Sequence, residues 1–446
     1  PHRARLVHRQ RAQAGRRSAV DRPRRLLHIV QRYAPYEGGS ENYMRELSER
    51  FAADGHAVTV LTTDAWDLEY FWNPAARRVN APPDETLNGA RVLRFPVRHY
   101  PASSLGYRVL RRAMAEGSRL PRVPGGEAIL RRGGRFAPWA PALHAWARRH
   151  ATEFDLVHAA NISIESTVIA GAGTARRGGV PFVVTPFVHL GSPGDARIVR
   201  YYSMPHQVRL LRDADATIVQ TEQERTFLTA RGVPDARLHR IGVGVHLRDV
   251  TGGDAERARR AFDLRGPIVY FSGTAAADKG TYDLIAAMRR IWDEGRDATL
   301  VLTGPMLSDV RAFFDAMSAE ERARIRPLGF VTKQTQANVL AATDVLALPS
   351  RTDSFGIVFL DAWANGIPVI GANAGGIPGV VSDGIDGLLV PFGDVAALAG
   401  ALRRLLDDPA LRQRMGEAGR AKVLARYTWE TIVASVAHLY DTLLRV

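Results

Sequence analysis

The sequence predicts an α/β protein with two domains, each built on a doubly wound parallel sheet, that face each other across a cleft. Three observations lead to this prediction. The chain has 446 residues, which is enough for two large domains. Short β-branched apolar segments that end at Gly or Pro alternate with segments of helical spacing. This alternation begins afresh near residue 236, which indicates a second sheet.

The first domain is expected to open with a strand–helix–strand unit. Residues 24–31 and 56–64 are short apolar runs bounded by turn residues. Between them Met44, Leu47 and Phe51 lie at helical spacing, which predicts an amphipathic helix. Such a unit builds a parallel sheet. Further strands of this sheet are expected at 155–160, 181–187 and 216–221.

The second domain shows the same alternation. Its strands are expected at 237–244, 266–273, 298–304, 325–330, 343–350, 367–373 and 387–394. The helices between them are expected at 280–294, 309–324, 333–342 and 355–364. Because ligands of doubly wound sheets bind outside the carboxyl ends of the strands, the functional residues are expected in the loops that follow these strands.

Composition and periodicity also predict where the parts of the chain begin and end. Residues 65–150 are rich in Pro, Arg and Trp with poor periodicity, which predicts an irregular insertion of loops and short helices. We predict a basic tail at 1–25, a first domain at 26–233, a second domain at 234–428 and a final helix at 429–446 that packs back on the first domain.

Several classes of protein are excluded by composition. The chain has no cysteine, which excludes disulfides, thiolate metal sites and cysteine nucleophiles. No run of 18 apolar residues predicts a membrane-spanning helix. The first 25 residues lack the apolar segment of a secretory signal, so the default expectation is a cytoplasmic protein.

The net charge of +14 is concentrated in two regions. Residues 1–25 carry nine arginines and one acid, and residues 91–150 carry 13 arginines and two acids. Only three lysines occur, so part of the arginine excess reflects a coding bias. The two basic regions still suggest an anionic surface or acceptor as a partner.

Two loops between a strand and a helix suggest phosphate binding. Gly38 and Gly39 follow the first strand, where backbone N–H groups at a helix start can approach a phosphate. Gly273 and Thr274 open the corresponding loop of the second sheet, which ends with Lys279. An ammonium group there is suited to neutralise a diphosphate leaving group. The alternatives are a structural glycine turn and a surface lysine.

The segment at 349–394 carries the strongest signal. Asp353 follows a strand and Asp361 lies in the next helix. A carboxylate can accept two hydroxyl hydrogen bonds, which suits a sugar diol or a ribose. Gly375 and Gly376 then form a turn whose N–H groups can face a phosphate or a hexose. Two aspartates eight residues apart are by themselves usually a solvated face, but this context argues against that interpretation.

The segment resembles the signature of family 4 retaining glycosyltransferases of the GT-B fold, in the nucleotide-sugar-dependent group 1. Residues 349–379 read PSRTDSFGIVFLDAWANGIPVIGANAGGIPG, against a family pattern of roughly PSxxExFGxxxxEAxAxGxPVIAxxxGGxPE. The resemblance extends to the turn at 38–39, to His189, to the stretch 241–246 and to Lys279. It is highly specific for the superfamily and poorly specific for the substrate.

The resemblance implies a retaining, front-face transfer of a hexose from a UDP- or GDP-sugar to a hydroxyl, with the acceptor in the first domain and the donor in the second. It implies the following roles: Lys279 with Gly38 and Gly39 for the diphosphate, Gly273 and Thr274 for the donor, Asp353 with Gly375 and Gly376 for the sugar, Asp361 for the ribose and His189 for the hexose. The donor is a co-substrate, and no other cofactor is expected. No metal is expected either, since the Asp213–Asp215 spacing is better explained by a turn that ends a helix.

The chain departs from the family pattern at four places. Asp353 and Asp361 stand where the family has glutamates, each about 1.5 Å shorter. Thr274 replaces an arginine of the lysine loop, and Gly379 replaces a glutamate. The stretch 243–246 reads Val-Gly-Val-His in place of Asn-Gly-Val-Asp.

Three alternatives remain open at this point. A sugar phosphorylase would keep Lys279 and the glycine turns without a nucleotide. An inactive sugar- or nucleotide-binding homologue would keep the fold. A nucleic-acid-binding protein has only the charge in its favour, since no recognised binding motif accompanies it.

The acceptor is expected to be a glycan, a lipid-linked sugar or a small molecule. The 13 arginines at 91–150, with Trp139 and Trp146, suggest peripheral contact with the anionic inner face of a membrane.

Overall fold

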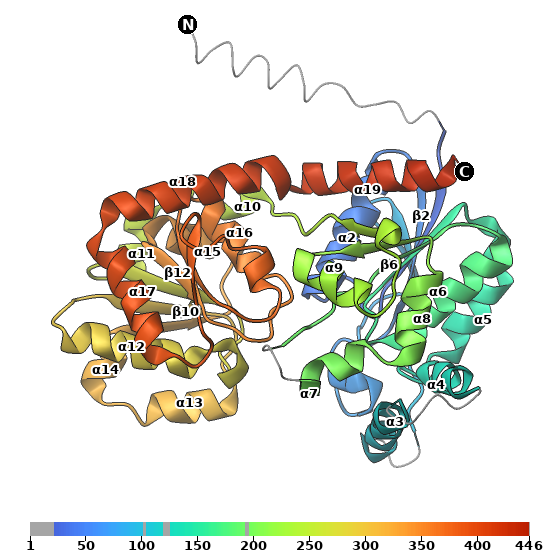
Figure 1. Ribbon diagram of the computed structural model, residues 1–446, viewed down its shortest axis with the longest axis horizontal. Helices are drawn as coiled ribbons and strands as arrows, with labels where there is room; N and C mark the ends of the chain where they lie inside the picture. The colour runs from blue at the N-terminus through green and yellow to red at the C-terminus, as the bar shows by residue number, and fades with distance from the viewer. Residues whose placement is uncertain (1–21, 101–103, 119–124, 192–195, 446) are drawn as a thin grey trace, which may run out of the picture. The chain divides into compact units, whose positions relative to one another are not determined.

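A computed structural model describes residues 22–100, 104–118, 125–191 and 196–445 (Figure 1). The chain forms two compact units. One ends at Thr185 and includes the chain from Thr442 onward, and the other spans Pro186–Asp441. Residues 1–21 of the predicted basic tail lie outside the described residues. The predicted domain boundaries stay predictions.

The first sheet has eight strands in the order β3-β4-β2-β1-β5-β6-β7-β8. The strand pairs β1–β2, β1–β5, β2–β4, β5–β6 and β7–β8 are parallel, and the pair β3–β4 is antiparallel. Its strands are β1 Arg25–Ile29, β2 Ala57–Thr63, β3 Asp84–Leu87, β4 Ala90–Phe95, β5 Leu156–Ala160, β6 Phe182–Thr185, β7 Ala216–Val219 and β8 Leu238–Arg240.

The second sheet has six parallel strands in the order β11-β10-β9-β12-β13-β14. Its strands are β9 Ile268–Ser272, β10 Thr299–Thr303, β11 Ile325–Gly329, β12 Val345–Leu348, β13 Val369–Ala372 and β14 Gly387–Val390. The prediction of two parallel-sheet α/β domains is confirmed. The strand expected at 237–244 as the first of the second sheet is an exception, because β8 pairs with β7 in the first sheet.

The helices follow the sequence pattern closely. Those before Thr185 are α2 Gly39–Ala53, η1 Leu68–Phe71, α3 Ser104–Gly117, α4 Gly126–Gly134, α5 Pro141–Arg149, η2 Ala151–Glu153 and α6 Glu165–Gly178. Those up to the second sheet are α7 Ala196–Val199, η3 Arg200–Tyr202, α8 Pro205–Asp213, α9 Glu222–Thr229, η4 Asp235–Arg237, α10 Leu247–Val250 and α11 Ala255–Phe262. Those that follow are η5 Ala277–Lys279, α12 Thr281–Asp293, α13 Ser308–Asp315, α14 Ala319–Ala323, α15 Lys333–Ala342, α16 Ile357–Ala364, η6 Ile377–Gly379, α17 Val395–Asp407, α18 Pro409–Arg426 and α19 Trp429–Leu444.

Two details differ from the prediction. The range 309–324, expected to be one helix, forms the two helices α13 and α14. Ser318 is the N-cap of α14: its hydroxyl accepts from the Glu321 N–H, and the Glu321 carboxylate accepts from the Ser318 N–H. The insertion at 65–150 contains two paired strands, β3 and β4, as well as the expected short helices. The expected helix-ending turn at Asp213 is present, since α8 ends there.

Both sheets have cores of nearly continuous apolar strands. Residues Ile268–Phe271 of β9 are completely buried, as are Val345–Ala347 of β12. Uninterrupted burial of this kind is typical of parallel strands covered by helices on both faces. Among the described residues, no helix has the length and apolar character needed to cross a membrane.

Two histidines are buried side by side in the first sheet. His28 on β1 and His158 on β5 are paired in register, and their rings meet edge to face at 5.7 Å. The Nδ1 atom of His28 lies 2.8 Å from the Ser48 hydroxyl, and the Nε2 atom of His158 lies 2.8 Å from the Thr185 hydroxyl. Burial lowers the pKa of His28 to about 3 and that of His158 well below its usual range.

This pair predicts loss of stability in acid. Between pH 6.5 and pH 3 the unfolded chain binds a proton at His28 that the folded chain excludes, so the free energy of unfolding falls as the pH falls. From pH 7 to pH 5 the loss from His28 alone is about 2 kcal/mol. In urea titrations, the His28→Gln variant should lose about 2 kcal/mol less than the wild type over this interval. Equal losses in the wild type and in the His28→Gln variant would contradict this explanation.

Candidate active site

Three loops meet at the carboxyl ends of neighbouring strands in the second sheet. They follow β9, β12 and β13, and β12 lies between the other two. The first two loops are joined by hydrogen bonds from the Arg351 N–H to the Asp278 carbonyl (3.0 Å) and from the Thr352 hydroxyl to the Asp278 carboxylate (2.7 Å). Parallel topology therefore brings together residues about 75 positions apart in the chain.

The two charged side chains that were predicted to bind the donor, Lys279 and Asp353, contact each other. The Lys279 Nζ atom lies 2.9 Å from the Asp353 Oδ2 atom, and the side chains keep 25% and 23% of their accessible surface. The family resemblance implies separate roles for the two residues, Lys279 for the diphosphate and Asp353 for the sugar. The structure shows that each is the counter-ion of the other while both remain in contact with solvent.

The glycine turn after β13 supports the loop that carries Asp353. Gly375 has a φ of +60°, and a Cβ atom there would lie 2.4 Å from the Asp353 carbonyl oxygen. A Cβ atom on Gly376 would lie 1.7 Å from the Ser354 carbonyl oxygen. The Gly375 N–H donates to the Gly191 carbonyl and the Gly376 N–H to the Asp353 carbonyl, each at 2.8 Å. Protein oxygens thus accept from the N–H groups that were expected to face a ligand, so ligand contact by this turn stays a prediction.

His189 belongs to the same cluster. Its Nδ1 atom lies 2.9 Å from the Thr352 carbonyl oxygen. A carbonyl only accepts, so Nδ1 carries the proton, and Nε2 is an acceptor in the neutral ring. Burial lowers the pKa of His189, and the nearby Lys279 lowers it further, against the opposing effect of Asp353. The ring stacks on Tyr202 with a centroid distance of 5.2 Å, which fixes its plane.

Glu224, which was not predicted from the sequence as a site residue, supports the segment before His189. Its carboxylate accepts from the Val188 N–H at 2.8 Å and from the Gln220 N–H at 2.7 Å. Phe187, next in the chain, has a φ of +50°, a conformation unusual for a non-glycine residue. Burial raises the pKa of Glu224 to about 7, although both N–H bonds oppose the shift. The signal available was the Thr221-x-x-Glu224 spacing at the start of α9, which is typical of a helix cap.

Asp361 lies in a different environment from Asp353. Its Oδ2 atom accepts from the Gln336 side chain at 3.3 Å, and α16 places it beside α15. Burial, together with the charge of Asp249, raises the pKa of Asp361 to about 7. No hydrogen bond or ion pair in the described parts of the chain joins Asp361 to Lys279 or Asp353. The two predicted carboxylates therefore differ in their surroundings, since Asp353 pairs with Lys279 and Asp361 accepts from Gln336.

Gly273 and Thr274 lie where the sequence predicts, in the loop after β9. Gly273 has a φ of +138°, and its N–H donates to the Thr303 carbonyl at 3.0 Å. A Cβ atom on Gly304 would lie 2.3 Å from the Gly273 carbonyl oxygen, so this loop also needs glycine for a close approach. Thr274 is partly exposed.

Gly38 and Gly39 lie at the start of α2, in the first compact unit. A Cβ atom on Gly38 would lie 2.6 Å from the Glu41 carboxylate, whereas Gly39 has open space around it. Glu41 is buried and binds Arg32 at 2.8 Å and the Gln31 amide at 2.9 Å. Gly38 therefore leaves room for a buried charge network, and its role toward a phosphate stays a prediction.

One departure from the family pattern has a clear physical reason. A Cβ atom on Gly379 would lie 2.0 Å from the Gln223 side-chain oxygen and 2.7 Å from the Thr221 Cβ atom. The start of α9 fills the space that a side chain at this position would need. A glutamate at 379 would not fit without a shift of α9.

Comparisons with known proteins identify the family and the fold. The model of the glycosyl transferase 4-like domain matches residues 38–244, and that of the glycosyl transferases group 1 matches residues 253–422. Glycogen synthase of Mycobacterium tuberculosis is 25% identical over 428 residues, which cover 93% of this chain and 94% of that protein. Sucrose-phosphate synthase from Thermosynechococcus elongatus has a TM-score of 0.71 at 25% identity, over 95% of this chain and 99% of that one. HepE of Anabaena, solved in complex with UDP, has a TM-score of 0.67 at 19% identity, over 94% of this chain and 100% of that one.

The fold is therefore that of the GT-B glycosyltransferases. The chain belongs to the group 1 glycosyltransferases with a family 4-like first domain, and it is a hexosyltransferase. The resemblance found in the sequence is confirmed at this level.

The close approach at Gly376 predicts a sensitive position. In the Gly376→Ala variant the new methyl group would overlap a backbone oxygen, so the loop must move and carry Asp353 away from Lys279. We expect a loss of about 10²-fold in turnover, the cost of a misplacement of about 1 Å in an active site. Gly400→Ala in α17 is the matched control, because a Cβ atom there meets nothing within 4 Å. Activity of the Gly376→Ala enzyme within twofold of the control would show that the turn does not position the loop.

Proposed function

We propose that the protein is a retaining hexosyltransferase that moves a hexose from a UDP- or GDP-sugar to an acceptor hydroxyl without a metal ion. The observation that carries the proposal is the cluster of His189, Lys279 and Asp353 at the carboxyl ends of the second sheet. HepE, which shares the fold, has been solved with UDP, and this supports a nucleoside diphosphate in the donor site.

Lys279 is proposed to hold the diphosphate. Its ammonium group faces a single carboxylate and is partly exposed, so an incoming diphosphate can replace or share the Asp353 contact. A fixed positive charge of this kind stabilises the negative charge that develops on the leaving group. Asp353, once released, can accept hydrogen bonds from the sugar hydroxyls.

His189 is proposed to orient the hexose. The proton on Nδ1 is committed to the Thr352 carbonyl, and the lowered pKa keeps the ring neutral at pH 7. Nε2 is then left to accept a hydrogen bond from a sugar hydroxyl. Glu224 holds the backbone that leads to this ring, so it is a positioning residue. Asp361 is proposed to bind the ribose diol.

The family mechanism assigns deprotonation of the acceptor to the leaving diphosphate, on the same face of the sugar. The protein then mainly positions the reactants and stabilises the leaving group. A sugar phosphorylase remains the second candidate, since Thr274 replaces the second cation of the lysine loop and a single phosphate needs fewer charges.

The proposed site of action is the cytoplasm, with peripheral contact between the basic region at 91–150 and an anionic membrane. The structure reduces the free charge of this region, because Arg91, Arg94 and Arg111 pair with Asp84, Glu85 and Glu165 in turn. Exposed arginines of the region such as Arg132, Arg148 and Arg149 would supply the attraction, at about 1 kcal/mol for each that reaches the surface.

The test is the stereochemistry of transfer. A panel of α-linked UDP- and GDP-hexoses should give a product that keeps the α configuration, seen in the anomeric proton couplings, and EDTA should not change the rate. An inverted product would contradict the retaining mechanism. Formation of a hexose 1-phosphate when inorganic phosphate replaces the nucleotide would favour the phosphorylase.

A further inference from the structure

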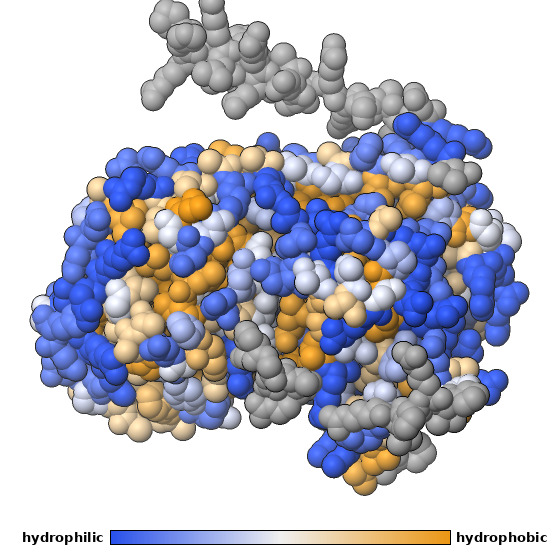
Figure 2. Space-filling view, in the orientation of Figure 1, coloured by the Kyte–Doolittle hydropathy of each residue, from blue (hydrophilic) through white to orange (hydrophobic). Residues whose placement is uncertain are grey.

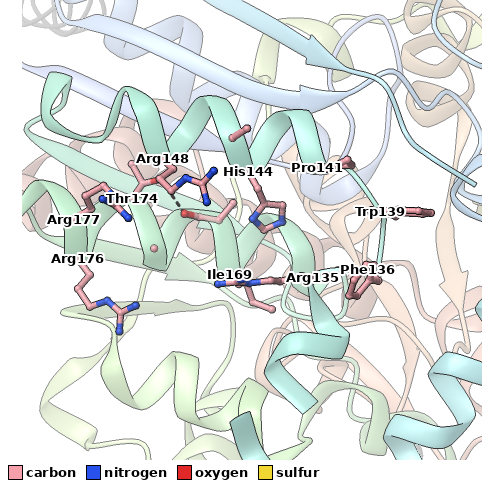
Figure 3. Close-up of a pocket in the computed structure, with 13 residues that line it drawn as sticks. Arg135, Phe136, Trp139, Pro141, His144, Arg148, Ile169, Thr174, Arg176 and Arg177 are labelled. Carbon is pink, nitrogen blue, oxygen red and sulfur yellow. Dashed lines mark hydrogen bonds between the residues drawn. The ribbon is translucent and has the colours of Figure 1, made fainter. Parts of the chain in front are cut away.

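A second candidate site lies in the first compact unit, outside the residues discussed so far. Helices α5 and α6 and the turn after α4 enclose an open pocket of about 430 Å³ (Figure 3). This volume lies in the range of about 300–1,000 Å³ typical of small-molecule sites. The lining residues that matter to the argument are Arg135, Arg148, Arg176, Arg177, Phe136 and Trp139.

The four arginines of this pocket are not neutralised. Among the described residues, none of their guanidinium groups has a carboxylate or a hydrogen-bond acceptor within reach. Nearby arginines behave differently, since Arg111 pairs with Glu165 and Arg91 with Asp84. The surface over α5 and α6 is correspondingly hydrophilic in the view of Figure 2. Four unpaired cations around one hollow favour an anion, and guanidinium groups bind phosphate oxygens in pairs.

The pocket also has an apolar end. Figure 3 shows Phe136 and Trp139 together at one end and Arg176 and Arg177 at the other, with His144 between them. Phe136 is 41% exposed, and its ring meets that of Trp139 edge to face at 5.8 Å, so the two rings form one partly exposed aromatic surface. A ligand that fills the pocket therefore needs an apolar or ring-shaped body next to its charged group.

His144 contributes shape more than charge. Its Nε2 atom lies 2.8 Å from the Ser166 hydroxyl, which in turn donates to the Arg135 carbonyl at 3.1 Å. These two hydrogen bonds fix the orientation of the His144 ring and connect it to the turn that carries Arg135. Burial, with the charges of Arg135 and Arg148, lowers the pKa of His144 to about 4, so the positive charge of the pocket at pH 7 comes from the guanidinium groups.

We propose that this pocket binds a phosphate-bearing ligand with an apolar or ring-shaped body. The arginine end takes the phosphate dianion, and Phe136 and Trp139 cover the body. This proposal does not rest on the proposed donor chemistry, because its residues belong to neither the lysine loop nor the glycine turn. The same chemistry is offered by a lipid headgroup and by a soluble phosphate ester, and the experiment separates the two.

The test compares two doubly substituted variants of the full chain. Arg148→Gln/Arg177→Gln removes two charges from the pocket, and Arg132→Gln/Arg149→Gln removes two exposed charges from α4 and α5 that do not line it. Calorimetric titration with phenyl phosphate should show at least about a tenfold loss of affinity for the pocket variant, as expected for lost charge-assisted hydrogen bonds. The control variant should stay within about twofold of the wild type.

Two further measurements test whether the apolar part of the ligand contributes to binding and whether the ligand is a lipid or a soluble ester. Inorganic phosphate should bind more weakly than phenyl phosphate, and Phe136→Ala should remove most of that difference. Sedimentation with phosphatidylcholine vesicles containing phosphatidylglycerol tests the lipid source: a defect of the pocket variant relative to the control supports a headgroup, and a defect with phenyl phosphate alone supports a soluble ester. Equal losses in the two double variants, or equal affinities for the two phosphates, would overturn the proposal.

Discussion

The ion pair between Lys279 and Asp353 is the contact on which the candidate site depends. A partly exposed pair of this kind adds little to stability, about 0–1 kcal/mol. Its importance lies in what surrounds it. The loop of Asp353 also receives the Gly376 N–H, and its neighbour Thr352 accepts from His189. One loop after β12 thus links the lysine, the histidine and the glycine turn, and a shift of this loop would disturb all three.

Most of the fold could be predicted, because strand and helix periodicities are local properties of the sequence. The errors concern properties that are not local. β8 was expected in the second sheet, since nothing within its three residues tells which sheet it joins. β4 lies in the range 65–150, which was expected to be irregular for its Pro, Arg and Trp content and poor periodicity, and Arg91 and Arg94 interrupt its apolar residues. Both are paired with acids on the neighbouring strand β3, and such pairing is set by tertiary structure.

The candidate site could be predicted in part for a related reason. Residues in loops after parallel strands meet at one edge of the sheet, so Lys279 and Asp353 could be predicted from their places in these loops together with the family resemblance. Their pairing could not be foreseen, and neither could the bond from Val188 to Glu224, which joins residues 36 positions apart. The arginine pocket combines side chains of α5 and α6 in the same way. At Gly379 the sequence shows a departure from the family pattern without a reason, and the structure gives one, because α9 fills the space of a side chain there.

The central claim is that Lys279 holds the diphosphate in competition with Asp353. The most direct measurement is the affinity for UDP or GDP, by calorimetry, of Lys279→Ala, of Asp353→Asn and of the double variant. The account predicts at least about a tenfold loss for Lys279→Ala, the value of one charge-assisted contact. It predicts tighter binding for Asp353→Asn, because the ammonium group no longer has a competing carboxylate, and no such gain when Lys279 is absent. Nucleotide affinity within threefold of the wild type in Lys279→Ala would contradict the account.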